Sequence, residues 1–341
     1  MKSFNPIVIV VLCFLVACFK AQAVSMETAI KHFEQNKLTM AKAHFLQLKK
    51  QGIKPKLSQF YLARIALSEG EFENALTLFE SIELSAQNTF SQDQYHYWLG
   101  ITNAKLASNA SWFKAAGYAT DAKAHFEKAV QLEPQNIRAR RGLFRYYLNA
   151  PVIAGGSVKK AKRQITALKG FSYVHADLLA LELAQYEKDK AQITQYAHKL
   201  MTYTHHSEAL YKAGMVYQNT GEFDNAFSAF QKAIALFDRE QNNELFKFSV
   251  LALYQFSKTA VIANKHVKAG IETMKRYLEQ PIQGSMPESY WAKFRLGQLY
   301  WLAGSQTKAE SLFNEITGTY QDAHLTNTLQ EFLANQGALD I

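Results

Sequence analysis

A window without acidic residues, from Pro134 to Ala176, contains nine basic side chains and could bind an anion. Within it, Arg138, Arg141 and Arg145 are spaced by three and four residues, which places them on one face of a helix. Like charges at this spacing repel each other. We therefore expect an anionic group to relieve them, such as a lipid phosphate, an acidic peptide or an acidic face of a neighbouring part of the chain. The predicted basic patch comprises Arg138, Arg141, Arg145, Lys159, Lys160 and Arg163.

A solvated basic face is the alternative interpretation of this window, as for most charge runs. Three acidic residues that precede it, Asp121, Glu127 and Glu133, could also form ion pairs with it. The formal charge of the whole chain is +9, so the window holds the entire excess. A basic chain could bind nucleic acid, but no RNA- or DNA-binding motif occurs, and we expect no nucleic-acid partner.

The sequence patterns that support catalysis are missing. Ten histidines are scattered without a metal-ligand spacing, and no zinc-protease, nucleophile-elbow, P-loop or dinucleotide-binding motif occurs. Both cysteines, Cys13 and Cys18, lie close to the N-terminus. We therefore expect a protein that is not an enzyme and that has no cofactor and no metal.

The first 23 residues are predicted to be a signal peptide. A thirteen-residue apolar run, residues 7–19, is followed by Ala21-Gln22-Ala23, which fits a small-x-small cleavage site. The run is shorter than the ~20 residues that span a bilayer, so we expect an exported, periplasmic protein. The alternative is an outer-membrane lipoprotein, because Leu15-Val16-Ala17-Cys18 resembles a lipobox in which Cys18 is lipidated.

Two segments repeat one pattern, which consists of Gly, an aromatic residue three positions later, and then Ala-x-x-x-Phe. They are Ala213-Gly214-x-x-Tyr217…Ala226-x-x-x-Phe230 and Leu296-Gly297-x-x-Tyr300…Ala309-x-x-x-Phe313. The pattern resembles the tetratricopeptide repeat, a helix–turn–helix of about 34 residues. The resemblance implies an all-α, right-handed solenoid, and such stacks are ordinarily binding surfaces rather than catalysts.

The Ala-x-x-x-aromatic marker predicts eight hairpins, of which the fifth and seventh are the weakest matches. An amphipathic stretch, Leu325 to Leu333, is predicted to cap the open end of the stack. The expected organisation is a signal peptide at 1–23, a solenoid at 24–320, and a capping helix with a tail at 321–341.

Two consecutive hairpins, the third and the fourth, carry insertions. Gly precedes the second-helix Ala by 12 residues in the strong copies, but by 22 (Gly100 to Ala122) and 19 (Gly142 to Ala161) here. Stacking places both turns on one edge, and insertions often collect on a binding face. Packing of the inserted side chains on one another is the alternative. The predicted insertion edge comprises Trp112, Phe113, Val152 and Ile153.

The concave groove is the usual peptide site of the family that the chain resembles. An aromatic groove with scattered amides and cations suits an extended peptide or an amphipathic helix. Packing between neighbouring first helices is the alternative for several of these aromatics, and for Phe294 and Trp301 we expect burial under the capping helix. Mapping the groove positions onto this sequence predicts Arg64, Tyr97, Tyr146, Tyr147, Tyr211, Asn219, Tyr254 and Lys258.

These features together favour an interaction scaffold of a bacterial cell envelope. Its expected partner is another envelope protein or peptide, bound in the groove or at the insertion edge. The alternative is a membrane-associated lipoprotein adaptor that recognises anionic lipid or envelope glycan through the basic fourth hairpin.

Overall fold

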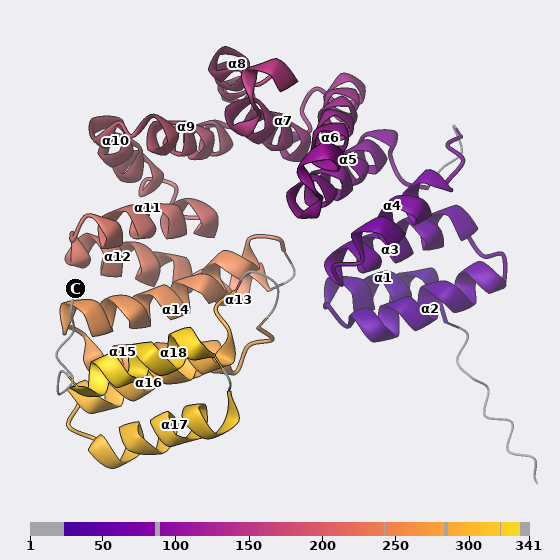
Figure 1. Ribbon diagram of the computed structural model, residues 1–341. Helices are drawn as coiled ribbons and strands as arrows, with labels where there is room; N and C mark the ends of the chain where they lie inside the picture. The colour runs from indigo at the N-terminus through magenta and orange to yellow at the C-terminus, as the bar shows by residue number, and fades with distance from the viewer. Residues whose placement is uncertain (1–23, 86–88, 242, 283–285, 321, 335–341) are drawn as a thin grey trace, which may run out of the picture.

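The computed structural model describes residues 24–85, 89–241, 243–282, 286–320 and 322–334, and all its regular elements there are helical. Consecutive helices pack in pairs, which gives eight hairpins followed by one further helix (Figure 1). The predicted all-α solenoid of eight hairpins with a capping helix is therefore confirmed, including the weak fifth and seventh hairpins. The predicted signal peptide, Cys18 and residues 335–341 lie outside the described residues.

Hairpins 1 to 4 form the first half of the stack. Their helices are α1 (Met26–Glu34) and α2 (Leu38–Lys50), α3 (Pro55–Ser68) and α4 (Phe72–Glu80), α5 (Gln92–Asn109) and α6 (Trp112–Leu132), and α7 (Ile137–Asn149) and α8 (Val158–Lys169), with the short 3-10 helix η1 (Val152–Ala154) between the last two.

Hairpins 5 to 8 and the capping helix form the second half. Their helices are α9 (Tyr173–Glu187) and α10 (Lys190–Leu200), α11 (Ser207–Asn219) and α12 (Phe223–Ile234), the short α13 (Phe237–Glu240), α14 (Phe246–Ala263) and α15 (Val267–Leu278), α16 (Ser289–Leu302) and α17 (Gln306–Thr319), and α18 (Ala323–Ala334).

Residues in the left-handed backbone region end the first helix of most hairpins. Gly70, Gly221 and Gly304 occupy this position in hairpins 2, 6 and 8, with φ between 73° and 82°. Glycine adopts this conformation without a steric penalty. Hairpins 5 and 7 use Lys188 and Asn264 instead, which explains in part why their repeat pattern is hard to recognise.

A close contact between glycine and phenylalanine holds the two helices of a hairpin together. A Cβ atom placed on Gly214 would lie 2.5 Å from the Phe230 ring, and one on Gly100 would lie 2.6 Å from the Phe126 ring. The same Phe126 ring also lies against Gly142 of the next hairpin. Only a residue without a side chain lets the helices approach this closely.

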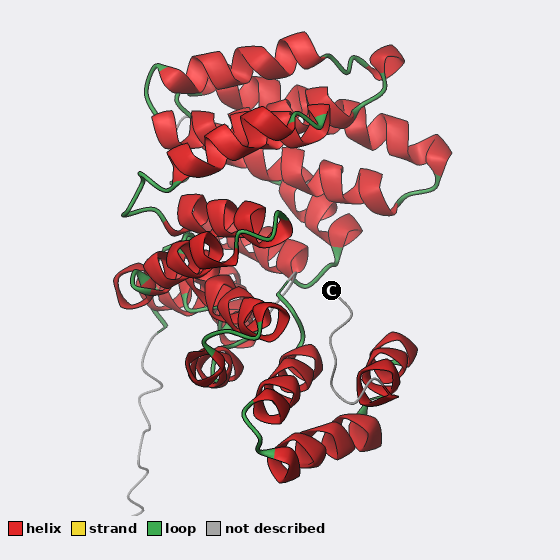
Figure 2. Ribbon diagram, turned by 90° about the vertical axis from the view of Figure 1, so that its left-hand side faces the viewer, coloured by secondary structure: helices red, strands yellow, loops and turns green. Residues whose placement is uncertain are grey.

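The stack curves into an arc, with α7 on its inner side and α8 on its outer side (Figure 1). Figure 2 shows the same stack from the side. The curvature brings parts of the chain that are far apart in sequence together. Arg138 of α7 forms an ion pair of 2.6 Å with Glu244, which precedes α14.

The ten-residue insertion of hairpin 3 is helical. It lengthens both helices, so that α5 has 18 residues and α6 has 21, and only Ala110 and Ser111 connect them. The expectation of an enlarged turn is therefore wrong for hairpin 3. In hairpin 4 the insertion does form an irregular connection, which contains η1.

The C-terminal end of the stack is covered by α18, as predicted. Phe294 of α16 is fully buried, and its ring lies 6.2 Å from that of Phe332 in α18. Trp301 also packs against Phe332. Among the described helices, none combines the length and the apolar character that a membrane span needs.

Candidate functional site

A cavity of about 1120 Å³ opens on the inner face of the arc. We call it the inner cavity, and six helices together with η1 and the segment before α14 contribute to it. Its walls include the following residues: Asp93, Tyr97, Ile101, Ala104 and Ala107 of α5; Ala115, Ala116, Ala119, Ala122 and Phe126 of α6; Arg138, Arg141, Arg145 and Tyr146 of α7; Ile153 and Ala154 of η1; His175 of α9; Glu208 and Lys212 of α11; and Glu244, Lys247 and Phe248 near the start of α14.

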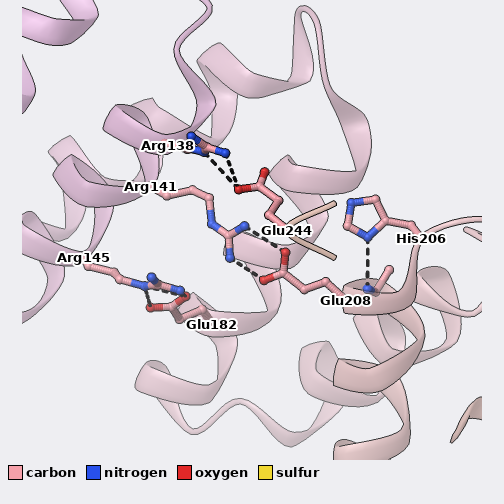
Figure 3. A network of polar contacts seen from close by, with 8 residues as sticks. Arg138, Arg141, Arg145, Glu182, His206, Glu208 and Glu244 are labelled. Atoms are coloured by element: carbon pink, nitrogen blue, oxygen red, sulfur yellow. Dashed lines mark hydrogen bonds and ion pairs between the residues drawn. The ribbon is translucent and has the colours of Figure 1, made fainter. Parts of the chain in front are cut away.

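Three arginines of α7 form a ladder of ion pairs along one wall of this cavity (Figure 3). Each pairs with an acid from a later part of the chain, which connects hairpin 4 to hairpins 5, 6 and 7. The pairs of this arginine ladder are Arg138–Glu244 at 2.6 Å, Arg141–Glu208, and Arg145–Glu182 at 2.9 Å.

The middle pair of the ladder is the most buried. Both terminal nitrogens of Arg141 donate to the carboxylate of Glu208, one of them at 2.9 Å, and the Glu208 side chain is only 4% exposed. Burial alone raises the pKa of Glu208, but its hydrogen bonds and ion pair with Arg141 outweigh burial, and the pKa is lowered. The outer pairs are much more exposed, so we expect their contribution to stability to be small.

A second buried carboxylate, that of Glu240 in α13, positions the segment that carries Glu244. Glu240 accepts a hydrogen bond from the hydroxyl of Ser249 at 2.8 Å and one from the backbone N–H of Ser207 at 3.4 Å. The Ser207 hydroxyl donates to the carbonyl of Leu245 at 2.9 Å. These contacts fix residues 244–248 against the start of α11, at the rim of the cavity.

The predicted basic patch is therefore not one surface. Arg138, Arg141 and Arg145 face the cavity and are neutralised by acids of later hairpins, not by the acidic residues before the window. Glu127 accepts instead from the Tyr147 hydroxyl at 2.8 Å. Lys159, Lys160 and Arg163 lie exposed on α8, on the outer side of the arc. The spacing of residues in the sequence could not distinguish the arginines of α7 from the cations of α8, because spacing does not show which part of the chain each helix faces.

Arg64 is a cation without an acidic partner among the described residues. Its guanidinium group lies between the rings of Phe33, at 4.5 Å, and Trp98, at 4.4 Å. Its Nε atom is buried and has no hydrogen-bond partner. Burial lowers the pKa of Arg64 to about 10, which leaves Arg64 charged at neutral pH. The charges of Arg138 and Tyr97 also influence this pKa, and because both residues line the cavity, Arg64 lies beside it.

Lys212 and Lys247 line the cavity itself, and no acid of the described chain lies within ion-pair distance of either. Both side chains are exposed on the wall. The protein around Lys212 reduces its hydration and lowers its pKa, which the nearby Glu208 and Glu182 only partly offset. Sequence reasoning missed both lysines because they belong to hairpins that are distant in sequence from the basic window.

The predicted groove tyrosines divide into two groups. Tyr97 and Tyr146 line the inner cavity, and the Tyr146 hydroxyl donates to the carbonyl of Ala154, which fixes η1 against α7. Tyr147 and Tyr254 are each 6% exposed and pack in the core, so they are not groove residues. Adjacent residues of a helix point about 100° apart, which is why Tyr146 and Tyr147 differ.

The other predicted groove residues lie outside the cavity walls. Tyr211 is partly buried and packs against Phe248, with ring centroids 5.7 Å apart. Asn219 is exposed at the end of α11, and Lys258 is partly buried on α14, where burial lowers its pKa.

The predicted insertion edge is strongly apolar and exposed. Val152 is 85% exposed, Ile153 is 99% exposed, and Phe113 is 86% exposed, so these side chains do not bury one another. Ile153 belongs to the cavity wall, whereas Val152 and Phe113 lie outside it. The side chain of Trp112 lies outside what the structure describes.

Two histidines that are far apart in sequence meet beside the arginine ladder. His175, His206 and Glu208 have possible ligand atoms within 4.8 Å of one another. Each residue already has a partner: the Ser172 hydroxyl for His175, the backbone N–H of Ala209 for His206, and Arg141 for Glu208. A metal would have to displace a bidentate arginine from Glu208, so the cluster is poorly suited to hold one.

Hairpin 6 supplies the comparison that decides the repeat type. Residues 207–238, which span α11 and α12, match the family model of the tetratricopeptide repeat. Hairpin 6 is thus similar to a tetratricopeptide repeat. Hairpin 6 is one of the two copies recognised by sequence pattern. No curated protein matches the chain at a significant level.

Among solved structures, similar helical repeat proteins cover most of this chain at low identity. A monomeric mutant of IFIT1 with m7Gppp-AAAA has 15% identity and a TM-score of 0.48, over 92% of this chain and 74% of that chain. The APC/C hetero-tetramer Cut9–Hcn1 has 14% identity and a TM-score of 0.47, over 89% and 54%. A signal transduction ATPase with a tetratricopeptide repeat sensor, from Pyrococcus horikoshii, has 13% identity and a TM-score of 0.48, over 89% and 48%. The chain thus spans about half the length of the last two, and scores below 0.5 carry no argument about what it binds.

Proposed function

We propose that the protein is a non-catalytic interaction scaffold of a bacterial cell envelope, and that it binds a peptide or protein partner in the inner cavity. The observation that carries this proposal is the meeting of two predicted sites in one cavity. Tyr97 and Tyr146 of the groove and Ile153 of the insertion edge line the same space. Its volume and its combination of apolar walls with charged groups are typical of a binding site.

Site-specific photocrosslinking tests this proposal in the organism's own envelope fraction. A photoreactive residue in place of Tyr97 or Ile153 should crosslink to one and the same partner. A photoreactive residue in place of Lys159, exposed on the outer helix α8, is the matched control and should not capture it. Capture from position 159 alone, or no capture from position 97, would contradict binding in the cavity.

The envelope location rests on the N-terminal sequence. The apolar run of residues 7–19 and Ala21-Gln22-Ala23 support export, with lipidation at Cys18 as the alternative. Mass spectrometry of the mature N-terminus distinguishes a chain that starts at Val24 from one that starts at a lipidated Cys18. An intact residue 1 on the mature protein would contradict both.

A second candidate function rests on the outer cations of α8. Lys159, Lys160 and Arg163 remain exposed, and they could bind anionic lipid or envelope glycan. Flotation with vesicles that contain anionic lipid should then fall steeply as salt is added. Flotation that is unaffected by a Lys159→Gln, Lys160→Gln, Arg163→Gln triple variant would exclude this site.

A further inference from the structure

The added turns of hairpin 3 present a face that no helix of the next hairpin covers. In a repeat stack, each hairpin buries its face against its neighbour. The helices α5 and α6 have 18 and 21 residues, whereas α7 and α8 of hairpin 4 have 13 and 12. Beyond α7 the chain forms the short η1 instead of a further helical turn. This leaves room for a helix at one end of the inner cavity.

Small side chains line that end of the cavity on both long helices. On α6, Ala115, Ala119 and Ala122 follow at spacings of four and three residues, and on α5, Ala104 and Ser108 are four residues apart. Residues at this spacing lie on one face of a helix. Alanine faces allow another helix to approach closely, since the distance between packed helices depends on the side chains at the contact.

The opposite wall is apolar as well, and the space between the walls fits a helix. Ile153 stands on η1 with 99% of its side chain exposed, and the hydroxyl of Tyr146 bonds to η1 and holds it in place. The cavity volume of about 1120 Å³ corresponds to a helix about 10 Å wide and about 14 Å long, or about ten residues.

The cavity also carries positive charge that the described residues do not neutralise. The three arginines of the ladder have acidic partners, but Lys212 and Lys247 on the wall have none among the described residues, and Arg64 beside the wall has none either. Cations without an acidic partner favour an anionic partner group.

We propose that the inner cavity takes an acidic amphipathic helix of the partner protein. Its apolar face packs on the alanines of α5 and α6 and against Ile153, and its carboxylates face Lys212 and Lys247. The inference rests on the proposed function, since it names the kind of partner segment that the same cavity accepts.

Fluorescence anisotropy with a labelled peptide tests this inference on the full chain. The probe is an amphipathic helical peptide of alanine, leucine and glutamate. A peptide of the same composition in scrambled order removes the apolar face, and a third peptide has lysine in place of glutamate. The amphipathic glutamate peptide should bind at least about tenfold more tightly than either control peptide, with an affinity that falls as salt is added.

Three variants and two matched controls locate the site. Ala119→Trp fills the alanine wall and should abolish binding, whereas Thr120→Trp, exposed and outside the cavity wall, should leave it unchanged. Ala116→Trp, at an exposed wall position, repeats the test where the fold tolerates a large side chain. Lys212→Gln should weaken binding about tenfold, and Lys159→Gln, which removes the same charge from α8, should not.

The inference is overturned if the scrambled peptide binds as well as the amphipathic one, or if Ala119→Trp and Ala116→Trp both bind normally while circular dichroism shows them folded. Preferred binding of anionic vesicles or of an oligonucleotide over the peptide also overturns it. If these results coincide with a partner that still crosslinks from position 97, only the acidic helix is wrong. If position 97 captures nothing, the proposed function itself fails.

Discussion

Hairpins 3 and 6 share the same contact between glycine and phenylalanine, but their helices differ in length. Gly100 meets Phe126 in hairpin 3 as Gly214 meets Phe230 in hairpin 6, with nearly equal close distances. The helices of hairpin 6 have 13 and 12 residues, however, and those of hairpin 3 have 18 and 21. The close contact between glycine and phenylalanine is the same in both hairpins and holds their helices together. The helical residues added beyond this contact determine which surface the neighbouring hairpin leaves uncovered.

The largest effect is expected from removing the shared aromatic ring. Phe230→Ala should lower the free energy of unfolding by about 3–5 kcal/mol, because the ring is fully buried and leaves a cavity. Phe126→Ala should cost at least as much, since its ring contacts glycines of two hairpins. Urea unfolding of both variants measures the difference, with Phe113→Ala, 86% exposed, as the control. A much smaller loss for Phe126→Ala would mean that hairpin 3 does not depend on the common contact.

The next effect concerns the ion pair that links the irregular hairpin 4 to hairpin 6. Glu208→Gln should lower the free energy of unfolding by about 3 kcal/mol, because it leaves the partly buried Arg141 without its counter-charge. A double variant, Arg141→Met with Glu208→Leu, should recover much of this loss. Equal stability of Glu208→Gln and the wild type in urea would show that the two regions are held together without this pair.

Acidification should weaken the same junction. Burial, followed by the charges of Arg141 and His206, lowers the pKa of His175 to about 4. A lowered histidine pKa means that the unfolded chain binds the proton more tightly, so stability should be constant above about pH 7 and should fall between about pH 6.5 and pH 4. Below that window the lowered pKa of Glu208 adds a further loss as its carboxylate is protonated. Urea unfolding at several pH values measures this, and His175→Gln should reduce the slope; an unchanged slope would assign the effect to the other histidines.

The smallest effect is expected at the exposed ends of the arginine ladder. Arg145→Gln and Arg138→Gln should each change the free energy of unfolding by less than about 1 kcal/mol, because their pairs are solvated. Thermal unfolding at low and high salt checks this, and salt should remove what difference there is. A loss as large as that of Glu208→Gln would mean that the exposed pairs of the ladder stabilise the fold as much as its buried pair does.

Much of the fold was readable from particular residues. The Gly214 and Phe230 pattern, repeated at Gly297 and Phe313, predicts helices that approach closely, and that contact is local enough to be encoded in one hairpin. The spacing of Gly100 and Ala122 also indicated an insertion correctly. It could not show that the added residues are helical, because the pattern marks only where the motif is interrupted.

The candidate site was only partly predictable. Tyr97, Tyr146 and Ile153 were identified and do line one cavity, but Tyr147 is in the core, since one step along a helix turns a side chain from the groove into the packing between helices. Lys212 and Lys247 could not be identified from the sequence. A single lysine is a candidate binding residue only if no acidic side chain lies near it, and that is visible only in the tertiary structure.

The sequence by itself determined the repeat and the number of hairpins, because these depend on side chains within a few turns of one another. Only the tertiary structure decided the partners of the charges. The curvature of the stack adds up over several hairpins, and it brings Glu244 to Arg138 across 106 residues of chain. Which arginines are neutralised, and which lysines remain open to a ligand, therefore follows from the arc as a whole rather than from any one repeat.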